Sequence, residues 1–91
     1  MVAVRLEIEG MVQGVGFRWW ARERARRHGL AGWVRNRSDG SVEIAVAGEP
    51  DEVERFIADV RDGPSGSRVD LVRRVALDPS QPLESPFSIA R

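Results

Sequence analysis

The sequence predicts an α+β fold of order βαββαβ, with two helices on one face of an antiparallel four-stranded sheet. Four segments alternate apolar and polar residues with the two-residue period of half-buried strands. Two further segments carry apolar residues at spacings of three and four, which is typical of amphipathic helices. Each helix has a single apolar stripe, so both can pack against the same face of the sheet. This arrangement is a ferredoxin-like sandwich.

The first half of the chain supplies a strand, a helix and a second strand. Alternation begins at Val4 and predicts a strand that ends at Gly10. A helix is expected from about Phe17 to His28, because Gly29 is a plausible stop. Its apolar stripe consists of Phe17, Trp20, Ala21 and Ala25. Residues 30–37 then predict the second strand.

A turn and a third strand follow, and a second helix comes after them. Asp39-Gly40 predicts a hairpin turn, since both residues tolerate a positive φ at little cost. Residues 42–48 alternate as a strand. Pro50 is favourable at the first position of a helix. The apolar stripe of this helix consists of Val53, Phe56, Ile57 and Val60.

The last third of the chain predicts one full strand and one short strand. Residues 63–66, Gly-Pro-Ser-Gly, end the second helix. Residues 69–75 alternate as a fourth strand, but the pattern leaves its inner face ambiguous. Residues 78–82 predict a surface connector, and residues 87–90 could add a short fifth strand at an edge.

Composition limits the classes of function. The chain has 91 residues, which predicts a single domain over residues 1–91. Basic and acidic residues number 14 each, so no net charge attracts nucleic acid or anionic lipid to the whole molecule. There is no cysteine and only one histidine, which excludes thiolate catalysis and sites with several cysteine or histidine ligands. We expect a cytoplasmic protein without signal peptide or membrane partner, because strand alternation starts at once and no apolar run approaches about 20 residues. We also expect a monomer.

The segment Gly14-Val15-Gly16-Phe17-Arg18 predicts a phosphate-binding loop. Two glycines allow a sharp turn that brings several backbone N–H groups into one concavity. The following helix begins with unpaired N–H groups and about half a positive charge. Arg18 adds a planar set of donors that matches two phosphate oxygens.

The alternative interpretation of this segment is a tight structural turn with Arg18 on the surface. The segment lacks the third glycine and the Lys-Ser ending of nucleotide-binding loops, so nucleotide binding fits poorly. In a purely structural turn, Arg18 would be repelled by the positive end of its own helix, at a cost of about 0.3–1 kcal/mol. A bound anion would reverse that cost, and we therefore favour the phosphate-binding interpretation.

Two longer motifs carry a resemblance to a known family. The segment Gly10-Met11-Val12-Gln13-Gly14-Val15-Gly16-Phe17-Arg18 resembles the first acylphosphatase signature. The segment Gly32-Trp33-Val34-Arg35-Asn36-Arg37-Ser38-Asp39-Gly40-Ser41-Val42 resembles the second. Two further segments also resemble the sequence pattern of the family: Gly63-Pro64 and Phe87-Ser88-Ile89. The resemblance covers essentially the whole chain.

The resemblance implies hydrolysis of a small-molecule acyl phosphate to a carboxylate and inorganic phosphate, without metal or other cofactor. Arg18 then matches the arginine that binds phosphate, and the amides of residues 14–18 share this task. Asn36 matches the asparagine that positions the attacking water. Judged without the family, Asn36 is an ordinary residue on the approach to a turn.

Two alternative functions stay open from the sequence. The phosphate-binding loop could belong to a non-catalytic phosphate or carbamoyl-phosphate-binding module. A nucleic-acid-binding domain of the same fold is the other alternative, because the first helix is rich in arginine. The strand at residues 42–48 has no aromatic residue on which bases could stack, so we expect no nucleic-acid partner.

Two side chains outside the motifs also receive a prediction. Trp19 lies off the apolar stripe of its helix, so we expect it to be exposed. Tryptophans in a small domain are more often core than ligand-binding. His28 lies at the end of the same helix, where we expect a favourable interaction with the negative pole of the helix dipole.

Overall fold

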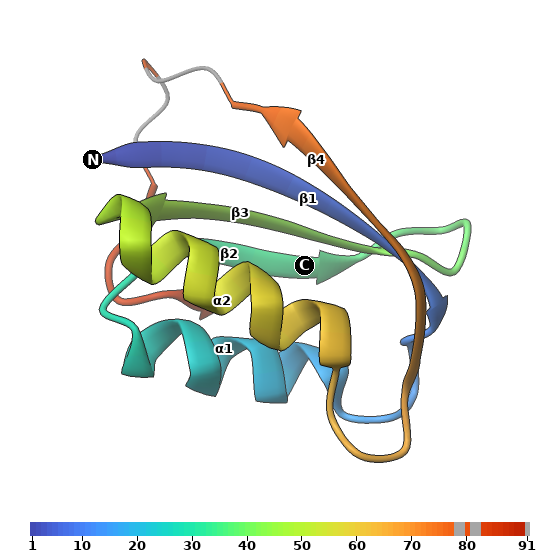
Figure 1. Cartoon of the computed structure of the whole chain (residues 1–91). Coiled ribbons are helices and arrows are strands. Elements are labelled where there is room, and N and C mark those ends of the chain that lie inside the picture. Colours follow the sequence, from blue (N-terminus) through green and yellow to red (C-terminus); the bar gives the residue numbers. More distant parts are fainter. Residues whose placement is uncertain (78–79, 81–82, 91) are drawn as a thin grey trace.

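The computed structural model describes residues 1–77, 80 and 83–90, and its elements follow the predicted order. They are β1 (Val2–Met11), α1 (Phe17–Arg27), β2 (Ala31–Asn36), β3 (Val42–Gly48), α2 (Pro50–Asp62), β4 (Arg68–Ala76) and β5 (Ser88–Ile89). Both helices lie on one face of the sheet, as Figure 1 shows. No helix in the described part of the chain is long and apolar enough to cross a membrane. Apart from Ser80, the connector predicted at residues 78–82 lies outside the described residues.

The strands form one sheet in the order β4-β1-β3-β2-β5. The four longer strands pair antiparallel, as predicted. The short fifth strand is present, but it runs parallel to β2, with Val34 opposite Ile89. Apolar alternation carries no information about strand direction, so the sequence left this pairing open. β1 also continues past its predicted end through a register shift between Glu9 and Gly10.

The core lies between the sheet and the two helices. Its largest fully buried side chains are Phe17, Phe56, Phe87, Leu6, Ile8 and Ile44. The predicted stripes are buried on both helices, except that Trp20 in α1 is only partly buried. β4 has no fully buried residue, and its Val69 and Val72 pack at the margin of the core. Its ambiguous pattern therefore reflects an edge strand that the helices cover only in part.

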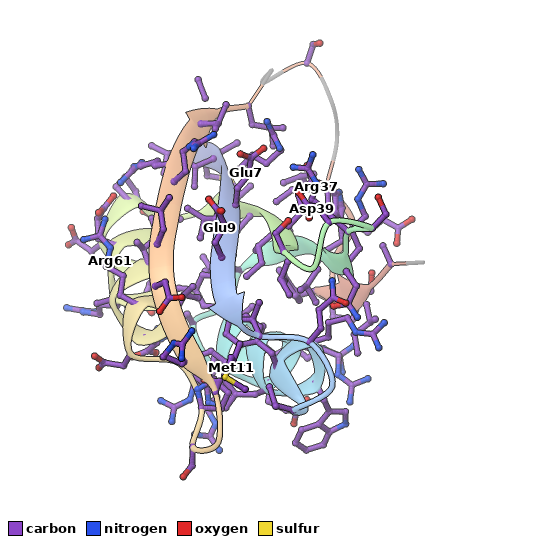
Figure 2. All side chains as sticks on the ribbon, turned by 90° about the vertical axis from the view of Figure 1, so that its right-hand side faces the viewer. Glu7, Glu9, Met11, Arg37, Asp39 and Arg61 are labelled. Carbon is purple, nitrogen blue, oxygen red and sulfur yellow. The ribbon has the colours of Figure 1, made fainter. Side chains whose placement is uncertain are left out.

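Ion pairs cover the open face of the sheet beside the β2–β3 hairpin. Glu43 is buried and accepts hydrogen bonds from Arg5 and Arg35, each at 2.6 Å. Burial by itself would raise the pKa of Glu43, but the bonds from Arg35 and Arg5 hold it below its ordinary value. Arg37 donates to Glu7 at 2.9 Å, and Figure 2 shows this part of β1 beside the hairpin. These pairs tie the hairpin to β1.

His28 is the C-cap of α1, where it was predicted, and its ring also joins the two helices. Its Nδ1 lies 2.9 Å from Glu52 Oε2, and its Nε2 lies 2.9 Å from Asp59 Oδ2. Arg24 Nη1 also lies 3.7 Å from the Asp59 carboxylate. Both ring nitrogens can donate only when the imidazole is protonated. Partial burial lowers the pKa of His28, but bonds to Asp59 and Glu52 outweigh it and raise the pKa above the ordinary 6.5.

We expect the free energy of unfolding to fall as pH rises through the raised pKa of His28. A raised pKa contributes stability that is complete below pH 6.5 and is lost as the folded protein deprotonates. The lowered pKa of Glu52 acts in the opposite direction, since its contribution is lost as pH falls below 4.5. Urea denaturation between pH 5.5 and 8.5 measures the loss. In His28→Gln the free energy of unfolding should change less over this pH range than in the unmodified chain. An identical pH dependence in the two proteins would contradict this assignment.

Candidate active site

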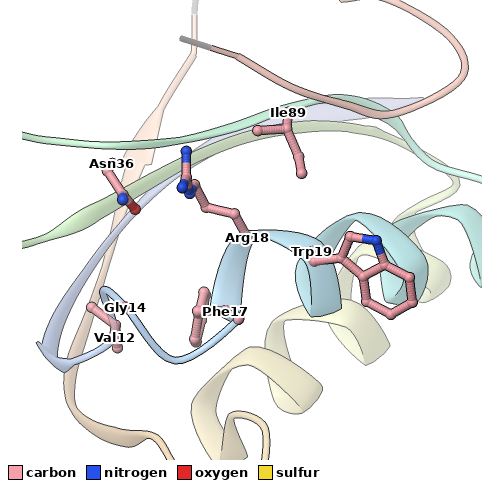
Figure 3. Close-up of a pocket in the computed structure, with 8 residues that line it drawn as sticks. Val12, Gly14, Phe17, Arg18, Trp19, Asn36 and Ile89 are labelled. Carbon is pink, nitrogen blue, oxygen red and sulfur yellow. The ribbon is translucent and has the colours of Figure 1, made fainter.

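A cavity opens between the β1–α1 loop and the end of β2. Its volume is about 220 Å³, and it is lined by Val12, Gly14, Gly16, Phe17, Arg18, Trp19, Asn36 and Ile89. The loop and the β2–β3 hairpin lie at the same end of the molecule (Figure 1). Figure 3 shows the side chains of Arg18 and Asn36 pointing toward one another. Residues far apart in the sequence therefore meet at one site.

The loop turns on two glycines in the left-handed region. Gly14 has φ +75° and Gly16 has φ +78°, a conformation that costs other residues about 1–2 kcal/mol. A Cβ atom added to either glycine would meet nothing within 4 Å. Glycine is therefore required by the backbone conformation and not by crowding. The same open space leaves the loop backbone accessible to a ligand.

The amides at the start of α1 have no acceptor in the helix. The first helical hydrogen bond runs from Trp20 N to Gly16 O at 3.0 Å, so the N–H groups of residues 17–19 precede the ladder. Within the described residues, no backbone carbonyl accepts from the amides of residues 14–16 either. The first turn of α1 holds no acidic side chain. These amides and the helix dipole together favour an anion in the cavity.

Arg18 is exposed and is available to a ligand. Among the residues that the structure describes, no carboxylate forms an ion pair with its guanidinium, and no hydrogen bond holds it. The side chain instead extends over the cavity toward the end of β2 (Figure 3). An unpaired guanidinium beside unpaired amides matches the charge and the planar geometry of a phosphate group.

Asn36 is the last residue of β2 and pairs with Val42 of β3. Its Oδ1 atom is buried and has no hydrogen-bond partner in the described part of the chain. Buried polar atoms in proteins are nearly always paired, so an unpaired one indicates a functional or solvent partner. A carboxamide can accept a hydrogen bond from water and also donate one to an anion.

Gln13 is a residue whose role the sequence did not reveal. Its Nε2 donates to Arg37 O at 2.8 Å and to Ser41 O at 2.9 Å. These two carbonyls lie at the base of the β2–β3 hairpin, next to Asn36. Gln13 therefore fastens the loop that carries Arg18 to the strand end that carries Asn36. Only contact information could have identified it, because glutamine has no distinctive spacing signal.

The structure brings together most of the residues predicted for the site. Gly14, Gly16, Phe17, Arg18 and Asn36 line the cavity. Val15 does not line it, and its side chain packs against the core. The ring of Phe17 is buried, so this residue offers its backbone to the cavity. Trp19 is 59% exposed, as predicted, and it lies at the cavity margin.

Comparison with known proteins assigns the chain to a family. The sequence model described as Acylphosphatase matches residues 4–89. The chain belongs to the acylphosphatase family. It is 54% identical to an acylphosphatase of Nitrobacter hamburgensis over 71 residues, which cover 78% of this chain and 72% of the relative. The crystal structure of acylphosphatase from Bacillus subtilis superimposes with a TM-score of 0.89 at 38% identity, covering all of both chains.

A larger protein contains a similar domain. Full-length HypF, in its phosphate- and nucleotide-bound form, matches with a TM-score of 0.88 at 32% identity. The match covers 99% of this chain and 12% of HypF. The acylphosphatase fold of this chain is thus shared by small acylphosphatases and by one part of a much longer protein.

The positive φ of Gly16 gives a test of the acylphosphatase loop. Gly16→Ala should lower the free energy of unfolding by about 1–2 kcal/mol and weaken phosphate binding. Gly29→Ala is the matched control, because Gly29 has φ +69°, open space around its Cβ position and no place in the cavity. The control should lose similar stability in urea denaturation but keep phosphate affinity in calorimetric titration. Equal effects of both variants on phosphate affinity would be inconsistent with a binding role for the loop.

The clamp at Gln13 gives a second test. Gln13→Ala removes two hydrogen bonds and should cost about 1–2 kcal/mol of unfolding free energy. Phosphate affinity should fall severalfold, because the loop is no longer fastened to the hairpin. Gln13→Asn should behave similarly, since its side chain is one methylene too short for both carbonyls. Unchanged phosphate affinity in both variants would show that the loop holds its shape unaided.

Proposed function

We propose that this chain is an acylphosphatase that hydrolyses the carboxyl–phosphate bond of small acyl phosphates. The observation that carries the proposal is the convergence of Arg18, Asn36 and unpaired loop amides on one cavity. Membership of the acylphosphatase family supports the same activity. The residue roles below follow from the chemistry of these groups.

Arg18 and the loop amides would hold the phosphoryl group. The carboxylate of an acyl phosphate is a good leaving group, so the reaction needs positioning and charge stabilisation more than a strong nucleophile. The guanidinium of Arg18 and the amides of residues 14–18 can donate to the phosphate oxygens. Each charge-assisted hydrogen bond contributes about 1.5–3 kcal/mol. Such donors stabilise the charge that spreads over these oxygens in the transition state.

Asn36 would position the attacking water. Its Oδ1 is an unpaired acceptor, so it can orient a water molecule toward phosphorus, opposite the departing carboxylate oxygen. The water oxygen forms a bond to phosphorus while the bond from phosphorus to the carboxylate oxygen breaks. One proton of the water passes to a phosphate oxygen of the substrate, and the other stays on the attacking oxygen. The products are a carboxylate and inorganic phosphate, and no side-chain base is required.

The alternative functions predict different behaviour. A non-catalytic module would bind phosphate without turnover, which a turnover assay decides directly. Nucleic-acid-binding domains of this fold present stacking aromatics on the open face of the central strands. The two central strands here are β1 and β3, and neither sequence contains an aromatic residue. The single-domain, monomeric and cytoplasmic state stays a prediction from the sequence.

Substitution of the two polar side chains tests the proposed roles. Arg18→Gln and Asn36→Ala should each lower kcat/KM for benzoyl phosphate by about 100-fold or more. The decrease in ultraviolet absorbance of benzoyl phosphate measures turnover. Arg18→Gln should also lose competitive inhibition by inorganic phosphate, whereas Asn36→Ala should largely retain it, because Arg18 holds the anion together with the loop amides, while Asn36 positions the water.

Circular dichroism and urea denaturation provide the folding control. Both side chains lie outside the apolar core, so near-native spectra are expected. Arg37→Gln is a matched arginine control on the neighbouring hairpin, outside the cavity. It should keep most activity. Substantial turnover by Arg18→Gln, or a comparable loss in Arg37→Gln, would refute the assigned roles.

A further inference from the structure

The cavity extends beyond the phosphate-binding groups to an exposed tryptophan. Trp19 lies in the first turn of α1, one residue after Arg18, and it is 59% exposed. Large apolar side chains are costly to leave in water, so a half-open indole ring beside a ligand cavity points to a contact with the ligand. The phosphate chemistry proposed above makes no use of this ring.

Two further apolar side chains line the same cavity. Val12 is the first residue of the β1–α1 loop, and Ile89 comes from β5. Ile89 is placed there by the parallel pairing of β5 with β2, which sets it opposite Val34, two residues before Asn36. In Figure 3 Ile89 lies over the start of α1, with Arg18 on one side and Trp19 on the other. The short fifth strand therefore contributes an apolar wall to the cavity.

A neighbouring arginine orients the indole ring. The guanidinium carbon of Arg22, one helical turn after Trp19, lies 5.5 Å from the ring centroid. A cation over an aromatic face at this distance is attractive and restricts the rotamers of both side chains. The ring is thus held in place before a substrate arrives, although much of its surface remains open to solvent.

We propose that Trp19 and Ile89 form a subsite for the acyl group, and that the preferred substrates are acyl phosphates with a flat, apolar acyl group such as an aromatic ring. This inference rests on the proposed function. With the phosphoryl group against Arg18 and the loop amides, the acyl group must leave the phosphate-binding end of the cavity. Trp19 and Ile89 are its apolar neighbours. An aromatic acyl group gains both apolar burial and ring stacking there, whereas an acetyl group is too small to gain either.

The size of the cavity supports a small acyl group. Its volume of about 220 Å³ is below the roughly 300–1,000 Å³ of pockets that enclose drug-sized ligands. A phosphate and a single ring fit this scale, while a long chain or a polymer would extend into solvent. The subsite therefore selects the acyl group of the substrate through stacking on one side chain, and not by enclosing it in a pocket.

The test compares benzoyl phosphate with acetyl phosphate in the unmodified chain and in Trp19→Ala. The substitution should lower kcat/KM for benzoyl phosphate about five- to tenfold and change kcat/KM for acetyl phosphate less than about twofold. Trp19→Phe should restore most of the preference, because phenylalanine also stacks. Trp33→Ala is the matched control: Trp33 also carries a stacked arginine, Arg35 at 5.0 Å, but lies outside the cavity.

Each outcome decides one proposal. A selective loss for benzoyl phosphate in Trp19→Ala, absent from Trp33→Ala, supports the acyl subsite. Equal changes for the two substrates, or no change for either, overturn the subsite while the hydrolase function stands. Hydrolysis of neither substrate by the unmodified chain would instead refute the proposed function. If Trp19→Ala fails to fold by circular dichroism, Trp19→Gln keeps a longer side chain than alanine without an aromatic ring and gives the same comparison.

Discussion

The site depends on one constraint: a helix begins with several backbone N–H groups that the protein leaves unpaired. Two positive-φ glycines turn the chain so that these groups face open space, and no acidic side chain in the first turn satisfies them. Arg18 adds a positive charge at the positive end of the helix dipole, where a carboxylate would be more stable. The local structure therefore favours a bound anion, and phosphate matches both its charge and its donors.

The rest of the fold holds the two halves of the site together. Gln13 fastens the loop to the hairpin, and Glu43 fastens β3 to β1 and β2 through Arg5 and Arg35. Asn36 ends β2 at the point where these contacts meet. Neither polar side chain of the proposed chemistry needs to make a structural bond of its own, which leaves Arg18 and Asn36 available to substrate and water. Rigid support around unpaired groups is what positioning catalysis requires.

The sequence predicted the elements well because both apolar periods are local. The order of the elements, the apolar stripes of the two helices and the exposure of Trp19 were predicted from the spacing of apolar residues. The phosphate-binding loop was predicted from its two glycines. Contacts between distant segments did not follow. The parallel pairing of β5, the clamp at Gln13 and the bridge from His28 to α2 each join residues whose spacing carries no signal. The meeting of Arg18 with Asn36 was expected only from the family resemblance, because strand order cannot be read from alternation.

Amide chemical shifts measured during titration with inorganic phosphate test the central claim most directly. The account predicts saturable shifts of the backbone amides of residues 14–18, together with the side-chain NH₂ of Asn36, at one common dissociation constant. Shifts centred instead on the arginine-rich open face of the sheet, around Arg5, Arg35 and Arg37, would contradict it. In that case the glycine loop would be a structural turn, and the anion site would lie elsewhere on the protein.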